Sequence, residues 1–312
     1  DLVCLMFSCA WQAQSWPTRP IRLVVPFGAG SPPDIASRLI ADRYLPILGQ
    51  AVAVENRAGA SGTIGLAEVM RQPADGYTFL ALPSTLASII SLYRDVKIDL
   101  RRDLEPVGQI DWSYNVLVVS QASTARSVAE LIALIKSQPG KLSYASGGTG
   151  TPAHLIAAQM LLATGTDAQH VPYNQFPQAV ADVVSDRVQF MIMGAPVAVP
   201  QVAAGKLRGL AVTRPGRMSV LKEVPSFAEA GHPDLMRRAW TGIVARAGTP
   251  QEIVVKMSQG LARIMTLPEV RERIASLQSE PADPDPRLFR ELVRIDMEVG
   301  ERVIREAGIK LD

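Results

Sequence analysis

A short apolar run, a glycine loop and a helical pattern follow one another repeatedly along this chain. The first copy joins residues 21–25 (IRLVV) to a glycine-containing turn and to a helical pattern that places Ile35, Leu39 and Ile40 on one face. Further apolar runs typical of strands cover residues 51–55, 77–82, 142–145, 188–193 and 209–213. Strands that alternate with helices in this way predict an α/β protein with parallel sheets, covered by helices on both faces.

The length of the chain favours two lobes, because a single hydrophobic core stops growing at about 250–300 residues. The chain has 312 residues, with 32 lysines and arginines interspersed among 30 aspartates and glutamates. It therefore lacks the basic stripe that would indicate a nucleic acid or an anionic membrane as the main partner. We expect a monomer that binds a small molecule.

The first residues resemble the end of an export signal. Residues 2–10 (LVCLMFSCA) are apolar but too short to span a membrane, which takes about 20 residues. Ala-Gln-Ser follows, a cleavage pattern that ends just before Trp16, so we interpret residues 1–15 as a signal peptide remnant of an exported, soluble periplasmic protein. The alternative is a buried N-terminal strand. Because Cys4 and Cys9 both lie in this leader, the cleaved chain would have no cysteine for thiol chemistry.

The common motifs for cofactors and catalysis are missing from the sequence. Gly28 and Gly30 begin a dinucleotide-binding pattern, but Pro33 stands where the last glycine is needed and has no amide to offer a pyrophosphate. There is no P-loop and no G-x-S-x-G, and no zinc motif surrounds the histidines His154, His170 and His232. We expect no catalytic residue, no cofactor and no metal, and an α/β enzyme is the interpretation that we favour least.

Two glycine loops deliver helix N-termini that could bind an anion. Ser31 is the expected N-cap of the first helix, with Asp34 closing a capping box, and Thr151 is the expected cap of a helix that begins at Pro152. Helix N-termini carry free N–H groups and a partial positive charge. Two of them facing each other across a cleft would hold a carboxylate. The alternative is that they are only well-capped helices.

Longer segments resemble a known family. These are WPTRPIRLVVPFGAGSPPD at residues 16–34, VENRAGASGTIG at 54–65, DGYT at 75–78, SVAELIALIKSQPGKLSYASGGTGTPAHL at 127–155, HVPY at 170–173, AGKLRGLAVT at 204–213 and VPSFAEAG at 224–231. They resemble the extracytoplasmic solute receptors of the tripartite tricarboxylate transporters, the Bug-type family of periplasmic binding proteins. The resemblance extends over nearly the whole chain after the leader.

This resemblance implies a two-lobe α/β fold of the Venus-flytrap type II, in which each lobe is a sheet flanked by helices and the lobes close on a ligand. Lobe 1 would comprise residues 16–115 and lobe 2 residues 116–235. Residues 236–312 would return to lobe 1 and form the C-terminal helices. The chain would cross between the lobes near residues 111–116 and again near residues 233–240.

The resemblance also implies a function, which is to bind a small organic acid between the lobes and deliver it to the membrane permease subunits of a tripartite tricarboxylate-type transporter. The alternative is a ligand-sensing periplasmic receptor that, once closed on its ligand, is presented to a membrane signalling kinase. Ligand-binding residues implied by the family's motifs are Phe27, Ala29, Gly30, Ser31, Asp34, Ser146, Thr149, Thr151, His154 and Tyr173.

Four residues depart from the family pattern. Phe176 and Met193 stand where the family tends to be small or polar, and Pro32 and Pro33 remove two amides from the start of the first helix. If Phe176 and Met193 line the site, a buried second carboxylate would lack donors and would be costly. We therefore predict a monocarboxylate or a related amide as the ligand. The alternative is that Phe176 packs in the core of its own lobe and Met193 merely ends a strand.

Overall fold

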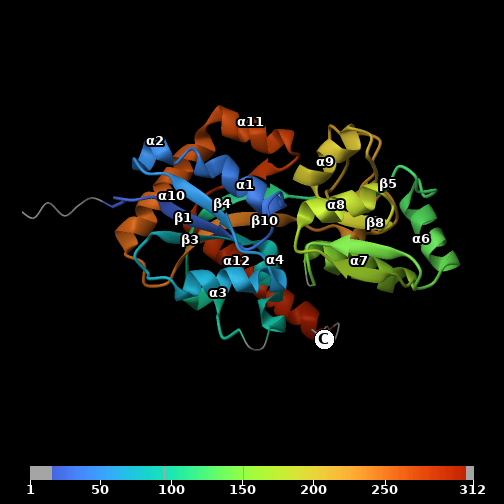
Figure 1. The fold of residues 1–312 in the computed structure, drawn as a ribbon, viewed down its shortest axis with the longest axis horizontal. Helices are drawn as coiled ribbons and strands as arrows, with labels where there is room; N and C mark the ends of the chain where they lie inside the picture. The colour runs from blue at the N-terminus through green and yellow to red at the C-terminus, as the bar shows by residue number, and fades with distance from the viewer. Residues whose placement is uncertain (1–15, 94–95, 150, 307–312) are drawn as a thin grey trace, which may run out of the picture.

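Two sheets lie side by side along the long axis of the molecule, each with helices on both faces (Figure 1). The structure is a computed structural model that describes residues 16–93, 96–149 and 151–306. We call the six-stranded sheet with its helices lobe 1, and the five-stranded sheet with its helices lobe 2. This arrangement confirms the predicted two-lobe α/β fold. The expected signal peptide remnant at residues 1–15 lies outside the described residues.

The sheet of lobe 1 has the strand order β11-β4-β10-β3-β1-β2. Its strands are β1 (Ile21–Val25), β2 (Val52–Asn56), β3 (Thr78–Pro83), β4 (Leu104–Ser113), β10 (Ala239–Arg246) and β11 (Glu280–Pro281). β1 runs parallel to β2 and β3, whereas β10 runs antiparallel to both β3 and β4.

The sheet of lobe 2 has the order β7-β6-β8-β5-β9. Its strands are β5 (Asn115–Ser120), β6 (Ser143–Ser146), β7 (Gln169–Pro172), β8 (Phe190–Gly194) and β9 (Leu207–Val212). β6 runs parallel to β7 and β8, and β5 runs antiparallel to β8 and β9.

The prediction of purely parallel sheets is therefore wrong, since both sheets are mixed. β5 follows β4 with only Tyr114 between them, and β10 enters lobe 1 after the chain has left lobe 2. A parallel neighbour in the same sheet needs a crossover connection, usually a helix. Strands that arrive from the other lobe have no such connection, so their direction is set by where the chain crosses.

Alternating side chains of each strand serve two separate cores. In lobe 1, Leu23 and Phe79 face one core while Val24 and Leu80 face the other. The first core is covered by α1 (Pro32–Ala41), α2 (Leu45–Leu48), α10 (Gln251–Thr266) and α11 (Pro268–Ser276). The second is covered by α3 (Thr63–Arg71), α4 (Ser84–Ile89), α5 (Leu100–Asp103) and α12 (Pro286–Glu306). Short 3₁₀ turns are η1 (Ala60–Gly62), η2 (Ile90–Leu92) and η3 (Pro233–Leu235).

Lobe 2 repeats this division. Leu117 faces the core under α6 (Val128–Ser137) and α7 (Pro152–Thr164), and Val118 faces the core under α8 (Phe176–Val184) and α9 (Ala195–Ala203). The hydroxyl of Ser127 accepts a hydrogen bond from the amide of Glu130 at 3.1 Å, so Ser127 is the N-cap of α6.

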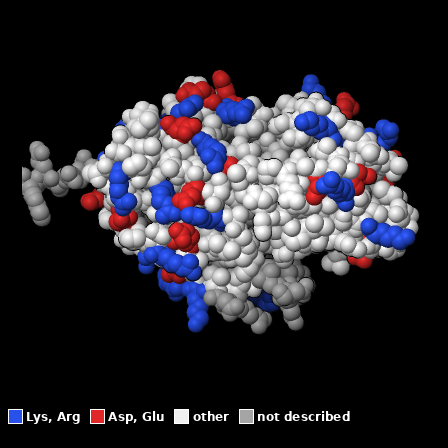
Figure 2. Space-filling view, in the orientation of Figure 1, with Lys and Arg blue, Asp and Glu red and all other residues white. Residues whose placement is uncertain are grey.

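Charged side chains of both signs are interspersed over both lobes on the face shown in Figure 2. Among the helices of the described ranges, none combines the length and the apolar character that crossing a membrane requires.

The C-terminal helix α12 fixes the returning strand β10. Phe289 of α12 is fully buried, and its ring meets that of Trp240 edge to face, with centroids 5.2 Å apart. The ring also lies directly over Gly242 of β10, where a Cβ would collide with it. Phe289 therefore links the helix to the strand.

We predict that Phe289→Ala lowers the free energy of unfolding by about 3–5 kcal/mol, because it removes the buried ring and leaves a cavity between α12 and β10. Leu288→Ala on the same helix is the matched control, since Leu288 is 57% exposed and its loss should change stability by no more than about 0.5 kcal/mol. Urea unfolding of both variants measures the difference. Equal effects of the two substitutions would contradict this account of α12.

Candidate ligand-binding site

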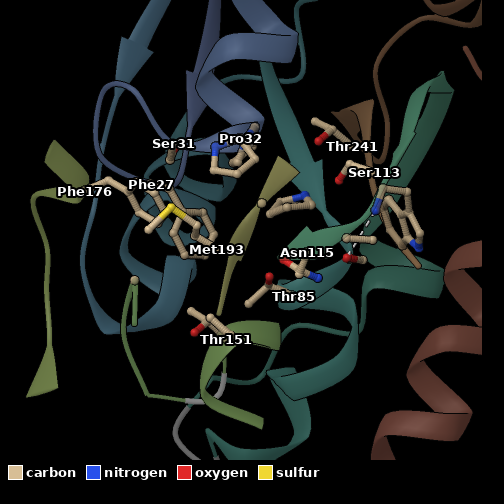
Figure 3. A pocket seen from close by; sticks show the side chains of 18 of the residues that line it. Phe27, Ser31, Pro32, Thr85, Ser113, Asn115, Thr151, Phe176, Met193 and Thr241 are labelled. Atoms are coloured by element: carbon tan, nitrogen blue, oxygen red, sulfur yellow. Dashed lines mark hydrogen bonds between the residues drawn. The ribbon is translucent and has the colours of Figure 1, made fainter. Parts of the chain in front are cut away.

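A cavity of about 610 Å³, including its mouth, lies where the two lobes meet. Figure 3 shows side chains from both lobes around it. Its apolar walls include Phe27, Pro32, Pro33, Pro83, Phe176, Ile192, Met193 and Trp240. Its polar side chains are Ser31, Ser84, Thr85, Ser113, Asn115, Thr151 and Thr241.

The direction of the strands builds this cavity. β1 and β3 of lobe 1 and β6, β7 and β8 of lobe 2 all end near it, and the helices that follow them, α1, α4, α7, α8 and α9, contribute their N-cap or first residues to its lining. Four of these helices, α1, α7, α8 and α9, are nine residues or longer. Since helix N-termini carry a partial positive charge, the cavity has a positive potential that comes from backbone dipoles.

The described lining contains no Lys, Arg, His, Asp or Glu side chain. An anion in this cavity would therefore be held by N–H and O–H donors and by helix dipoles, not by an ion pair. A cation would find no carboxylate among these residues and would face the positive ends of the helices.

Thr151 caps α7 as predicted. Its hydroxyl accepts a hydrogen bond from the amide of His154 at 3.3 Å and donates one to the carbonyl of Gly148 at 2.9 Å. The residue therefore fixes the glycine loop and the first turn of α7 while its side chain also lines the cavity.

The structure contradicts the capping box predicted for Ser31 and Asp34 at the start of α1. Ser31 is the N-cap, but its hydroxyl makes no capping bond. Asp34 instead accepts hydrogen bonds from the Gly30 amide at 2.9 Å, from Asn56 Nδ2 at 2.8 Å and from Arg38. Burial alone would raise the pKa of Asp34, but these bonds together hold it below its ordinary value. Asp34 thus ties down the first loop, and it lies outside the cavity lining, as do Ala29 and Gly30.

In lobe 2, three polar side chains form a cluster behind the glycine loop. The Ser146 hydroxyl is 2.7 Å from Nε2 of His170, and the ring of His170 stacks on that of His154 with centroids 4.0 Å apart. Burial, with the neighbouring His154, lowers the pKa of His170 to about 4, so the ring is neutral at neutral pH. Ser146 and His154 support the loop from outside the cavity lining.

Two other predicted residues make contacts of a different kind. The Tyr173 hydroxyl donates to Asp182 at 2.7 Å, within lobe 2. The Thr149 carbonyl accepts a hydrogen bond from the hydroxyl of Ser61, which belongs to lobe 1, so this contact joins the lobes. Neither Tyr173 nor Thr149 lines the cavity.

The cavity thus brings together five of the residues predicted for the site, namely Phe27, Ser31, Thr151, Phe176 and Met193. Their contact with a ligand stays a prediction. The prediction missed the lining residues Ser84, Thr85, Ser113, Asn115, Trp240 and Thr241. Ser113, Asn115, Trp240 and Thr241 lie in or beside the predicted crossing segments. That position is the one feature of the sequence that could have placed them at the site.

Two polar atoms of the lining are buried without a hydrogen-bond partner. Among the described residues, four buried side-chain nitrogen or oxygen atoms lack a partner, and two of these are Oγ of Ser31 and Nδ2 of Asn115. Both residues line the cavity. Buried polar groups are nearly always hydrogen-bonded in folded proteins, so these two unpartnered atoms are exceptions that call for an explanation.

A buried carboxyl group lies behind one wall of the cavity. Asp111 on β4 accepts a hydrogen bond from the amide of Thr241 at 3.1 Å, where a register shift interrupts the pairing of β4 with β10. Burial raises the pKa of Asp111 to about 7, and hydrogen bonds from Thr241 offset only part of the effect.

Proteins of known sequence and structure resemble this chain over nearly its whole length. The family described as tripartite tricarboxylate transporter family receptor matches residues 36–309. Protein BugT of Bordetella pertussis is 32% identical over 301 residues, which cover 96% of this chain and 92% of that protein. The structure of periplasmic binding protein BugD is similar with a TM-score of 0.91 and 29% identity, covering 95% of this chain and 99% of that one. R. palustris Rpa4515 with adipate has a TM-score of 0.89 and 33% identity, covering 95% and 99% of the two chains.

Asp111 predicts a pH dependence of stability. Its folded pKa of about 7 lies above the value of about 3.9 in an unfolded chain, so the folded protein holds this proton more tightly. The free energy of unfolding of the wild type should therefore fall, relative to Asp111→Asn, as the pH rises from about 4 to about 7. Urea unfolding across this range measures the difference. Asp42→Asn, at an exposed position, is the control and should follow the wild type. Parallel curves for wild type and Asp111→Asn would contradict the prediction.

Proposed function

The chain belongs to the tripartite tricarboxylate transporter receptor family, and we propose that it is a periplasmic receptor that binds a small organic acid between its lobes and delivers it to a tripartite tricarboxylate-type permease. Membership of this family confirms the predicted resemblance to Bug-type receptors. The observation that carries the proposal is the convergence of helix N-termini on a cavity whose described lining has no charged side chain. Such a site favours an oxyanion, because amides and dipoles solvate it without a counter-ion.

We propose further that the ligand has one carboxylate and an apolar or aromatic body, or is a related amide. Phe176 and Met193 both line the cavity, which supports the larger and less polar site expected from them. Trp240 adds an aromatic wall, and its indole N–H already donates to Asp296. A second carboxylate against these walls would lose its hydration without a charged partner, at a cost of several kcal/mol.

A dicarboxylate is the competing ligand class, because the similar R. palustris protein is described with adipate. The two classes differ in what they need at the end of the cavity away from the carboxylate anchor. A dicarboxylate needs a second cluster of donors there, whereas a monocarboxylate needs apolar contact. The two prolines at the start of α1 reduce the number of free amides around the cavity, so fewer donors remain for a second carboxylate once the first is bound.

Closure of the lobes would couple binding to delivery. The lobes already meet beside the cavity, where a Cβ on Gly28 of lobe 1 would lie 2.6 Å from the carbonyl oxygen of Asn174 in lobe 2. A ligand that contacts both lobes binds the closed form more tightly than the open one and shifts the equilibrium accordingly. The closed form would then be the one that the permease recognises.

Calorimetry tests the ligand class. The protein is first unfolded and refolded to remove any ligand that it carries. The affinity for branched or aromatic monocarboxylates should be at least about 10-fold higher than for succinate, adipate or citrate. This corresponds to a difference in binding free energy of about 1.4 kcal/mol or more. A binding ligand at about 100 times its dissociation constant should also add about 2.7 kcal/mol to stability. Tighter binding of the dicarboxylates would overturn the monocarboxylate proposal but leave the receptor function intact.

The substitution Thr151→Val tests whether Thr151 contacts the ligand or only caps α7. The substitution removes the N-cap of α7 and should cost about 1 kcal/mol of stability, and it should also weaken ligand binding. Ser127→Ala is the matched control, because it removes the N-cap of α6 but lies outside the cavity lining. If both variants lose stability and both keep their affinity, Thr151 is a cap only.

A further inference from the structure

We propose that Asn115 recognises an uncharged oxygen acceptor on the ligand, so that the preferred ligand is a monocarboxylate that also carries a carbonyl, hydroxyl or amide oxygen. This inference rests on the function proposed above and defines the ligand of the same cavity more closely.

The side chain of Asn115 is buried, with 7% of the residue exposed, and lines the cavity. Figure 3 shows it among the side chains that surround the cavity, on the side of Thr85. Its Nδ2 has no hydrogen-bond partner within the described parts of the chain. An amide N–H₂ that is buried in this way has lost water without regaining a protein acceptor, which is unfavourable. A ligand oxygen in the cavity would satisfy it.

The backbone holds Asn115 in place without help from its side chain. Its amide donates to Oγ1 of Thr213 at 2.9 Å, its carbonyl accepts from the Thr213 amide at 2.9 Å, and it pairs with Gly194 of β8. Since these bonds fix the start of β5, Nδ2 of the side chain is not needed to hold the strand in place.

The location of Asn115 favours a neutral acceptor over the carboxylate. Ser31, the other lining residue with an unpartnered polar atom, is the N-cap of α1 and therefore lies at the positive end of a helix. Asn115 instead begins a strand at the crossing between the lobes. Figure 3 shows the two residues on different sides of the cavity. A carboxylate is best placed among the helix N-termini near Ser31, which leaves Asn115 for another part of the ligand.

The test uses two pairs of acids that differ only by a ketone oxygen: pentanoate with levulinate, and hydrocinnamate with phenylpyruvate. Calorimetry with refolded wild type should show about 10-fold to 100-fold tighter binding of the keto acid in at least one pair, which corresponds to satisfying one buried donor. In Asn115→Leu the affinities within that pair should become equal. Ser113→Ala, which alters another polar side chain of the lining, is the control and should keep the preference.

The outcomes separate this inference from the proposed function. If wild type binds these acids without preferring the keto acid of either pair, or if the preference survives in Asn115→Leu, the role of Asn115 is wrong while the receptor function stands. If wild type binds none of the monocarboxylates, the proposed ligand class fails and this inference fails with it. Should Asn115→Leu not fold, as judged by its thermal transition, Asn115→Ser replaces it with the same expected loss of preference.

Discussion

The cavity depends on one constraint, which is the direction of the parallel strands. A chain that alternates strands and helices leaves each strand at its carboxyl end and begins a helix there. In this protein the carboxyl ends of β1 and β3 face those of β6, β7 and β8, so the helices that follow begin around the same space. Backbone dipoles then give this space a positive potential that needs no lysine or arginine. The positive potential is a consequence of the topology and not of any single residue.

The antiparallel strands make a different contribution. β4 passes directly into β5, and β10 returns beside β4, so the crossing strands form one wall of the cavity. Asn115, Trp240 and Thr241 enter the lining through these strands. A ligand that touches them touches the segments on which the lobes would turn. On the proposed mechanism, recognition and closure therefore share residues, and Asp111 behind Thr241 gives that wall a buried group that can gain or lose a proton.

Local signals predicted the parts of the site that depend on neighbouring residues. The cap at Thr151 could be predicted because an N-cap bonds to an amide only three residues away. The hydrogen bond from Asn56 to Asp34 could not be predicted, because Asn56 comes from the end of another strand and sequence spacing does not reveal such a contact. The stacking of His154 on His170 of β7 is hidden from the sequence for the same reason. Trp240 could not be assigned to the lining because its position depends on the pairing of β10 with β4 far earlier in the chain.

A binding site without charged side chains also suits a protein that must release its ligand. In a buried ion pair, removing one partner leaves the other uncompensated, at a cost of several kcal/mol. Here the donors on the described lining are hydroxyls, an amide and helix N-termini, which water can solvate when the ligand departs. They are also divided between the lobes, with Ser31 and Thr85 on one side and Thr151 on the other. Opening the lobes would separate these two sets, so that neither alone would hold the carboxylate, and the motion that admits solvent would also weaken binding.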